Sequence, residues 1–181
     1  MIPKVIHYCW FGGNPLPKDA LACIASWKKF FPDYEIKEWN ESNFDVNSCP
    51  YVKGAYEQKK YAFVSDYARF WVLYKEGGLY FDTDVEVIKN MDHIVERGSF
   101  MGFEKSLATQ NENSEELLGI NAGLGMGAEA KMPLLRELLD LYESKQSFMI
   151  DEGTIVHHTT QMLKKYGFVN KHKFQDVAGF K

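Results

Sequence analysis

The amino-acid sequence predicts an α/β fold in a single domain. Between residues 4 and 39, an apolar strand-like segment, a segment with helical periodicity and a second strand-like segment follow one another, and this order is typical of α/β proteins. At 181 residues, the chain is long enough for one domain with a substantial core. It contains no internal repeat and no linker-like stretch, so we take residues 1–181 as one domain.

The first three elements can be assigned from their patterns. Lys4–Phe11 is apolar and rich in β-forming residues, as expected for a buried strand that enters a loop. Tyr34–Trp39 alternates charged and apolar residues, which predicts a second strand. Between them, Leu16–Phe31 has helical periodicity. The apolar residues of this predicted helix are Leu21, Ile24, Trp27 and Phe31.

The middle of the chain combines a loop, a helix and two strands. Residues 40–55 are rich in Asn, Ser, Pro and Gly, and we expect a loop there. Residues 58–76 form the strongest helical pattern, and the glycines that follow supply a stop signal. Leu79–Phe81 and Val85–Ile88 are predicted to be strands.

The second half continues with two strands and two helices. Phe100–Phe103 and Ile120–Met126 are short strand candidates. Pro133 opens a helix that we expect to reach Tyr142, and a last helix is expected from Gly153 to Tyr166. No element is evident in residues 169–181.

Composition narrows the classes of protein. Hydrophobic residues make up 45% of the chain and aromatic residues 15%, which excludes a disordered protein. The net charge of -4 offers no basic surface for nucleic acid, so no nucleic-acid partner is expected. Three cysteines without paired spacing favour a reducing, cytoplasmic setting. The chain has no signal-peptide pattern and no long apolar run, so we expect at most peripheral association with the inner face of a membrane.

The triplet Asp82-Thr83-Asp84 is the chief chemical signal. In an extended backbone, residues i and i+2 point to the same side, so the two carboxylates could approach one cation. Oxygen ligands suit Mg²⁺ or Mn²⁺, and such an ion would neutralise the charge of a departing nucleoside diphosphate. The flanking segments are apolar, and two acids there need a partner to offset their desolvation. The alternative is a pair of carboxylates at a solvent-facing strand end.

Asp66 and Arg69 form a second candidate pair on the long helix. They are three residues apart, so they share a face of the helix, where neither would be buried unpaired. One interpretation is a structural ion pair. The other is that Asp66 accepts hydrogen bonds from sugar hydroxyls while Arg69 contacts a phosphate or sugar oxygen.

Three segments together resemble the glycosyltransferases that carry a DxD motif: Ile2–Gly12, Val64–Arg69 and Tyr74–Asp84. The likeness is strongest to glycosyltransferase family 32, the group of bacterial capsular-polysaccharide and Och1-type sugar transferases. A more distant similarity is to the glucosylating domains of large clostridial toxins. The match is dense over residues 2–88 and thinner beyond.

This resemblance implies a GT-A fold, which is a Rossmann-like mixed sheet flanked by helices. It also implies a retaining hexosyltransferase that requires Mn²⁺ or Mg²⁺ and takes a UDP- or GDP-linked sugar as donor. The acceptor would be a hydroxyl of a saccharide or lipid-linked saccharide, in the synthesis of bacterial surface polysaccharide. Family members usually continue into a further C-terminal segment, so we expect this domain to be shortened after Lys181.

The resemblance also implies roles for individual residues. Asp66 and Arg69 match residues that hold the donor sugar. Asp82 and Asp84 match contacts to the metal and the ribose, with Asp84 the firmer direct ligand. Residues implied to lie at the nucleotide or donor sugar are Cys9, Trp10, Tyr80 and Asn121. Trp10 could stack on the base or simply pack in the core.

The sequence also suggests roles for three histidines and leaves two alternative functions open. We expect His7 to be a core residue. His157 and His158 could suggest a pair of metal ligands, but neighbours on a helix point about 100° apart and cannot easily share one ion, so we expect them to be surface or packing residues. A metal-dependent nucleotidyltransferase is one alternative, but the expected basic triphosphate loop is missing beside Gly12-Gly13. A noncatalytic module that binds nucleotide sugars is the other.

Overall fold

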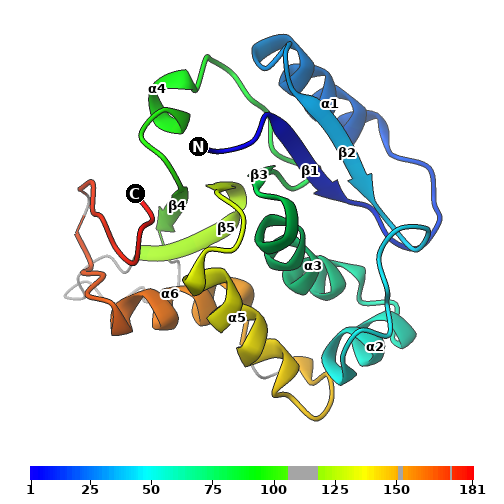
Figure 1. Cartoon of the computed structure of the whole chain (residues 1–181). Coiled ribbons are helices and arrows are strands. Elements are labelled where there is room, and N and C mark those ends of the chain that lie inside the picture. Colours follow the sequence, from blue (N-terminus) through cyan, green and yellow to red (C-terminus); the bar gives the residue numbers. More distant parts are fainter. Residues whose placement is uncertain (106–117, 151–152, 172) are drawn as a thin grey trace, which may run out of the picture.

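A computed structural model describes residues 1–105, 118–150, 153–171 and 173–181. Within these residues, one mixed sheet has the strand order β2-β1-β3-β5-β4 and is flanked by helices (Figure 1). The strands are β1 (Val5–Cys9), β2 (Glu35–Trp39), β3 (Gly78–Tyr80), β4 (Phe100–Lys105) and β5 (Leu118–Ala128). The helices are α1 (Lys18–Phe30), α2 (Pro50–Glu57), α3 (Tyr61–Glu76), α4 (Asp92–Val95), α5 (Pro133–Glu143) and α6 (Ile155–Lys165). The predicted α/β class is confirmed.

The sheet brings the ends of two parallel strands together. β1 pairs in parallel with β2 on one side and β3 on the other, with His7 opposite Tyr80. β5 runs antiparallel to both β3 and β4. Because β1 and β3 are parallel neighbours, the residues that follow both strands emerge at the same edge of the sheet. Ligands of open α/β sheets bind at such edges.

The two faces of the sheet are covered by different helices. Side chains alternate along β3, so that Leu79 packs with α1 while Tyr80 packs with α3. α5 and α6 extend the layer on the α3 side, where α6 packs against β5. The residues predicted to be the apolar face of α1 include Leu21, but Leu21 is 52% exposed, and Ala20 joins Ile24 and Trp27 in the core instead.

The central helix α3 is buried around most of its circumference. It begins at Tyr61 rather than at the predicted residue 58, because Lys59 has a φ of 57° and interrupts the helical backbone. It ends at Gly77 as predicted, with a φ of 69°, and a Cβ there would lie 2.9 Å from the Ala130 nitrogen. α3 is thereby fixed in position at its C-terminal end, and it carries both Asp66 and Arg69.

Three sequence predictions about local structure were wrong. Residues 50–57 form helix α2 within the predicted loop, with Pro50 in its first turn. α4 was not predicted at all. Val85–Ile88 is not a strand, because its backbone bonds to α1 instead: Trp27 Nε1 donates to the Val85 carbonyl at 2.7 Å, and the Val87 N–H donates to Ser26 Oγ at 2.9 Å.

The remaining elements follow the predictions closely. Both strand candidates of the second half are present and longer than expected, and α5 and α6 match the two predicted helices to within two residues at each end. Residues 169–181 contain only an isolated bridge between Val177 and Phe180, among the positions that are described. No helix in the described parts of the chain has both the length and the apolar character needed to span a membrane.

Candidate functional site

The candidate site begins where the chain leaves β3. Asp82 follows Phe81, and the Asp82 N–H donates to the Gly123 carbonyl of β5 at 3.1 Å. The chain then turns, and the Val85 N–H donates back to the Asp82 carbonyl at 3.0 Å. The DxD triplet therefore lies in a turn and not in the extended segment that the sequence predicted. Its two carboxylates consequently meet different surroundings.

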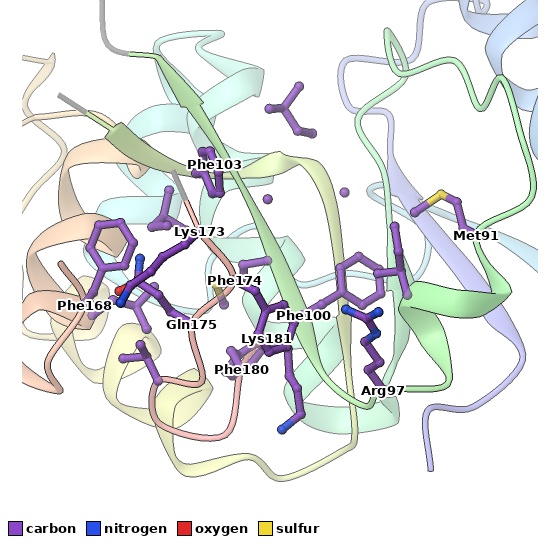
Figure 2. A pocket seen from close by; sticks show the side chains of 18 residues that line it. Met91, Arg97, Phe100, Phe103, Phe168, Lys173, Phe174, Gln175, Phe180 and Lys181 are labelled. Carbon is purple, nitrogen blue, oxygen red and sulfur yellow. The ribbon is translucent and has the colours of Figure 1, made fainter. Parts of the chain in front are cut away.

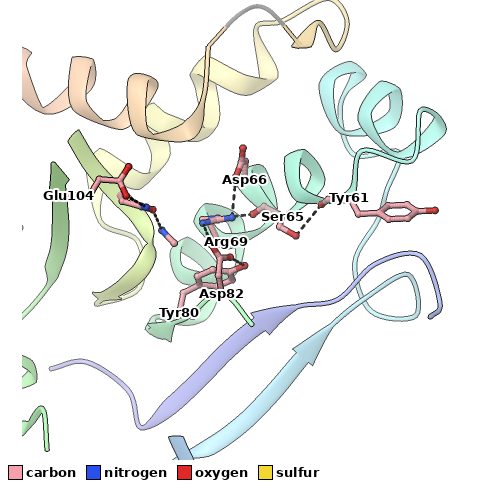
Figure 3. A network of polar contacts seen from close by, with 9 residues as sticks. Tyr61, Ser65, Asp66, Arg69, Tyr80, Asp82 and Glu104 are labelled. Carbon is pink, nitrogen blue, oxygen red and sulfur yellow. Dashed lines mark hydrogen bonds and ion pairs between the residues drawn. The ribbon is translucent and has the colours of Figure 1, made fainter. Parts of the chain in front are cut away.

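Asp82 belongs to a buried network centred on Arg69 (Figure 3). Arg69 Nη1 donates to Asp82 Oδ2 at 3.1 Å, and Nη2 donates to Asp66 Oδ1 at 3.0 Å. Arg69 Nε donates to the Ser65 carbonyl at 3.1 Å. We call Asp66, Arg69, Tyr80 and Asp82 the buried network. The predicted pairing of Asp66 with Arg69 is confirmed, and the same guanidinium also holds Asp82.

Tyr80 completes the buried network. Its hydroxyl donates to Asp82 Oδ1 at 3.1 Å, and its ring lies 4.9 Å from Arg69 Cζ. Burial raises the pKa of Tyr80 well above its ordinary value, so the hydroxyl stays protonated and remains a donor. Burial likewise raises the pKa of the Cys9 thiol, to about 12. The side chains of Cys9 and Tyr80 are both buried and are not open to solvent.

The protonation of Asp66 is finely balanced. Burial raises its pKa to about 6, the Asp82 carboxylate adds to the rise, and Arg69 opposes it. One guanidinium thus serves two carboxylates in a low-dielectric environment, and the network carries a net negative charge when both acids are ionised. Such strongly perturbed groups gather at functional sites more often than elsewhere.

Asp84 contrasts with its neighbour Asp82. Its side chain is exposed, and within the described ranges it has neither a hydrogen-bond nor an ion-pair partner. Asp82 is 34% exposed, so its carboxylate is open on one side while the network holds the other. Both side chains are carboxylates and offer oxygen atoms only, which suits a hard cation such as Mg²⁺ or Mn²⁺.

This donor set fits a metal site that is completed by other ligands. Among the residues that the structure describes, no group of three His, Cys, Asp or Glu side chains could hold a metal ion. Asp82 and Asp84 alone would leave most positions of an octahedral ion to water and phosphate oxygens. Mg²⁺ sites of enzymes that act on phosphates commonly have this composition.

Gly123 is a site residue that the sequence analysis did not single out. A Cβ at this position would lie 2.0 Å from Asp82 Oδ2 and 2.8 Å from Arg69 Nη1, so no side chain fits there. The Gly123 N–H donates to Asn121 Oδ1 at 2.8 Å, and Asn121 Nδ2 donates to Glu104 at 2.8 Å. Asn121 is therefore linked to the network through Gly123, and Glu104 was not foreseen.

Trp10 and His7 lie outside the network. Trp10 is half-buried just after β1, and its Nε1 donates to the Asn14 carbonyl at 2.6 Å. His7 is the core residue that the sequence predicted: its Nε2 donates to the Gly77 carbonyl at 2.9 Å, and its Nδ1 accepts from Trp39 at 3.0 Å. Burial lowers the pKa of His7, so it stays neutral. His158 packs edge-on against Tyr142, as a packing residue would.

Comparison with known proteins confirms the resemblance to DxD glycosyltransferases. Residues 17–101 match the family model of the glycosyltransferase sugar-binding region containing a DXD motif. The matched region contains the whole buried network, whereas the opening segment 2–12 lies outside it. Over 98 residues, the chain is 31% identical to inositol phosphoceramide mannosyltransferase 3 of Schizosaccharomyces pombe. That alignment covers 52% of this chain and 27% of the relative, so the chain matches about a quarter of the relative's length.

Solved structures confirm the GT-A type of fold. The PaToxG glycosyltransferase superposes with a TM-score of 0.66 at 19% identity, covering 91% of this chain and 69% of that one. A structure described as a transferase superposes with a TM-score of 0.53 at 12% identity, covering 90% of this chain and 84% of that one. At these identities, the likeness concerns the fold alone.

Proposed function

We propose that this chain is the catalytic domain of a metal-dependent hexosyltransferase, which moves a hexose from a nucleotide diphosphate sugar to a hydroxyl acceptor. The observation that carries the proposal is the arrangement of Arg69 between Asp66 and Asp82 at the edge of the sheet, followed two residues later by the exposed Asp84. The match of residues 17–101 to a sugar-binding region supports it.

The two acids of the triplet would divide the work of holding a cation. Asp84, exposed and without a partner in the described chain, would be the direct ligand. Asp82 would contribute the side of its carboxylate that the network leaves open. When bound, Mn²⁺ or Mg²⁺ supplies a Lewis acid that offsets the negative charge of the departing diphosphate. The turn at Thr83 lets one acid stay anchored while the other reaches outward.

Arg69 would act chiefly by positioning the two carboxylates. Three of the five N–H groups of its guanidinium are used by Ser65, Asp66 and Asp82. The two others remain for oxygens of the donor, where a fixed positive charge stabilises developing negative charge. Asp66 uses one carboxylate oxygen for Arg69, so the second could accept hydrogen bonds from the hydroxyls of the donor sugar.

The nucleotide would lie beyond the ends of β1 and β3. Trp10 is half-buried there and could stack on the base with its exposed part, while Cys9 and Tyr80 support the site from behind. Asn121 lies on the Gly123 side of the network, near the expected donor sugar. No carboxylate in the described site is placed as an obvious nucleophile, so we propose retention by a same-face mechanism in which the leaving phosphate helps to deprotonate the acceptor.

The proposal extends to the acceptor, the biosynthetic process and the location in the cell. We propose a saccharide or lipid-linked saccharide acceptor, in bacterial surface polysaccharide synthesis, at the cytoplasmic side of a membrane. The relative from S. pombe is named an inositol phosphoceramide mannosyltransferase, and this name supports a hexose donor and a lipid-type acceptor for the proposal.

Donor hydrolysis tests this function directly. UDP- and GDP-linked glucose, galactose and mannose would each be incubated with the chain, with Mn²⁺ or with a chelator, and the released sugar would be quantified. We expect one donor to be hydrolysed with retention at a rate that Mn²⁺ increases. Binding of a donor without any Mn²⁺-stimulated hydrolysis would instead identify a noncatalytic nucleotide-sugar-binding module.

A further inference from the structure

A cavity of about 370 Å³, distinct from the buried network, lies between α4, strands β4 and β5 and the C-terminal residues (Figure 2). β4 and β5 form one wall, and residues 173–181 form another. Its volume lies within the range of about 300–1,000 Å³ that is usual for small-molecule sites. None of the residues assigned to the donor site lines it.

The lining of this cavity is largely apolar and partly open to solvent. Phe103, Leu124 and Phe174 all line it, and they are 40%, 46% and 59% exposed. Three large apolar side chains that face the same hollow are not expected on a surface without a ligand, because exposed apolar residues are usually scattered singly. The cavity therefore has the walls of a site for an apolar group.

All charged side chains that line the cavity are positive, although the whole chain has a net charge of -4. They are Arg97, Lys173 and Lys181. Lys181 pairs with Asp176. Arg97 lies over the ring of Phe174 at 5.4 Å, and neither Arg97 nor Lys173 has a carboxylate partner in the parts of the chain that are described. Two available cations at the edge of an apolar hollow are complementary to an anion that carries a hydrocarbon group.

We propose that this cavity binds an anionic lipid, with its hydrocarbon chain against Phe103, Leu124 and Phe174 and its charged headgroup at one of two cations, Arg97 or Lys173, which Figure 2 shows on opposite sides of the cavity. A peptide strand is a poorer occupant, because the neighbouring edge of β4 is already bonded: the Met101 N–H donates to the Lys181 carbonyl at 3.3 Å, and the Lys181 N–H donates to Ser99 at 2.9 Å. A free inorganic phosphate would leave the apolar walls without a role.

The cavity adjoins the candidate donor site along β5. Leu124 lines the cavity, and the preceding residue, Gly123, touches Asp82. A lipid held here would thus lie next to the proposed site of sugar transfer. Lipid binding goes beyond the proposed transferase function, and it is measured without a donor or Mn²⁺, so that its failure and the failure of the transferase proposal are distinguishable.

Alkyl phosphates of defined length test the proposal by calorimetry on the full chain, below the concentrations at which they form micelles. Burial of each methylene strengthens binding about fourfold, so decyl phosphate should bind about 16-fold more tightly than octyl phosphate. Inorganic phosphate and decyltrimethylammonium should show no comparable binding. Equal affinity for octyl and decyl phosphate, or equal binding of the cationic amphiphile, would overturn the proposal.

Two matched pairs of variants locate the binding. Phe174→Asp should weaken decyl phosphate binding by about tenfold or more, whereas Leu21→Asp, at an apolar residue exposed to a similar extent on α1, should leave it unchanged. The double variant Arg97→Gln/Lys173→Gln should weaken it severalfold, and Lys28→Gln/Lys29→Gln on α1 should not. Thermal unfolding would verify that each variant folds. Undiminished binding by folded Phe174→Asp protein would place the lipid elsewhere and contradict the assignment.

Discussion

Asp82 and Asp84 lie two residues apart, yet they belong to contrasting regions of the molecule. Asp82 is held by Arg69 and Tyr80 in the buried network, while Asp84 projects from an exposed turn without a partner in the described chain. From this difference we propose that one motif combines two tasks. The buried half would contribute to stability and fix the geometry, and the exposed half would meet a ligand.

Removal of the Arg69 guanidinium should produce the largest change in the free energy of unfolding. Arg69→Met leaves the buried Asp66 carboxylate and the partly exposed Asp82 carboxylate without their shared partner. We expect the free energy of unfolding to fall by about 3–5 kcal/mol, as for other broken buried ion pairs. Urea denaturation would measure it. Lys75→Met, at an exposed cation on the same helix, is the matched control and should change stability by less than about 1 kcal/mol.

A small effect of Arg69→Met would break the contrast between the two regions. If its unfolding free energy matched that of the Lys75→Met control, the network would not contribute to stability. Asp82 would then be as dispensable to the fold as Asp84.

The pH dependence of stability should reveal Asp66. Its pKa is about 6 in the folded state against 3.8 ordinarily, so the folded protein binds the proton more tightly than the unfolded one between these values. Stability therefore falls as the pH rises from 4 to 6, by up to about 3 kcal/mol for this group. Urea denaturation of the wild type and of Asp66→Asn at several pH values would measure it. In Asp66→Asn, the unfolding free energy should lack this fall between pH 4 and 6. If the free energies of the wild type and the variant changed in parallel with pH, the pKa of Asp66 would not be raised by folding.

Gly123 lies close to Asp82 and Arg69, so a substitution there should disturb the buried network more mildly than loss of Arg69. Gly123→Ala places a methyl group against Asp82 Oδ2 and forces the carboxylate or β5 to move. We expect a loss of about 1–3 kcal/mol in unfolding free energy, as for other overpacked sites. Gly102→Ala on β4 is the control, because its nearest neighbours would lie at 3.9 Å, an ordinary contact distance. Thermal and urea unfolding that ranked the two variants equally would argue against a tight fit at Gly123.

The regular elements could be predicted from the sequence because their signals are local. The helical spacing in α3 placed Asp66 beside Arg69, and Gly77 marked the end of the helix. The predicted parallel strand β1 and the position of the triplet directly after a strand were also correct in outline. These features depend on residues a few positions apart, so periodicity and turn chemistry suffice to find them.

The parts that could not be predicted depend on contacts between distant residues. The chain after the turn at Asp84 is held by a hydrogen bond from Trp27 to the Val85 carbonyl, which no local pattern reveals. The two acids were therefore expected to share one side of a strand. Arg69 was paired with Asp66 by its spacing, but its second bond, to Asp82, requires the packing of α3 against β3. The same packing leaves no room for a side chain at Gly123.

The most direct test of the separate roles of Asp82 and Asp84 is whether a donor still raises the melting temperature of Asp84→Ala in a Mn²⁺-dependent way. Thermal unfolding would be recorded for the wild type, for Asp84→Ala and for Asp33→Ala, which is an exposed control. Each protein would be measured with the intact nucleotide sugar that the hydrolysis assay identifies as the donor, with and without Mn²⁺. Without ligands, Asp84→Ala should melt within the small range of a neutral surface substitution. We expect stabilisation by donor plus Mn²⁺ in the wild type and in Asp33→Ala, and its loss in Asp84→Ala. An equal Mn²⁺-dependent shift in all three proteins would contradict a cation-binding role for Asp84.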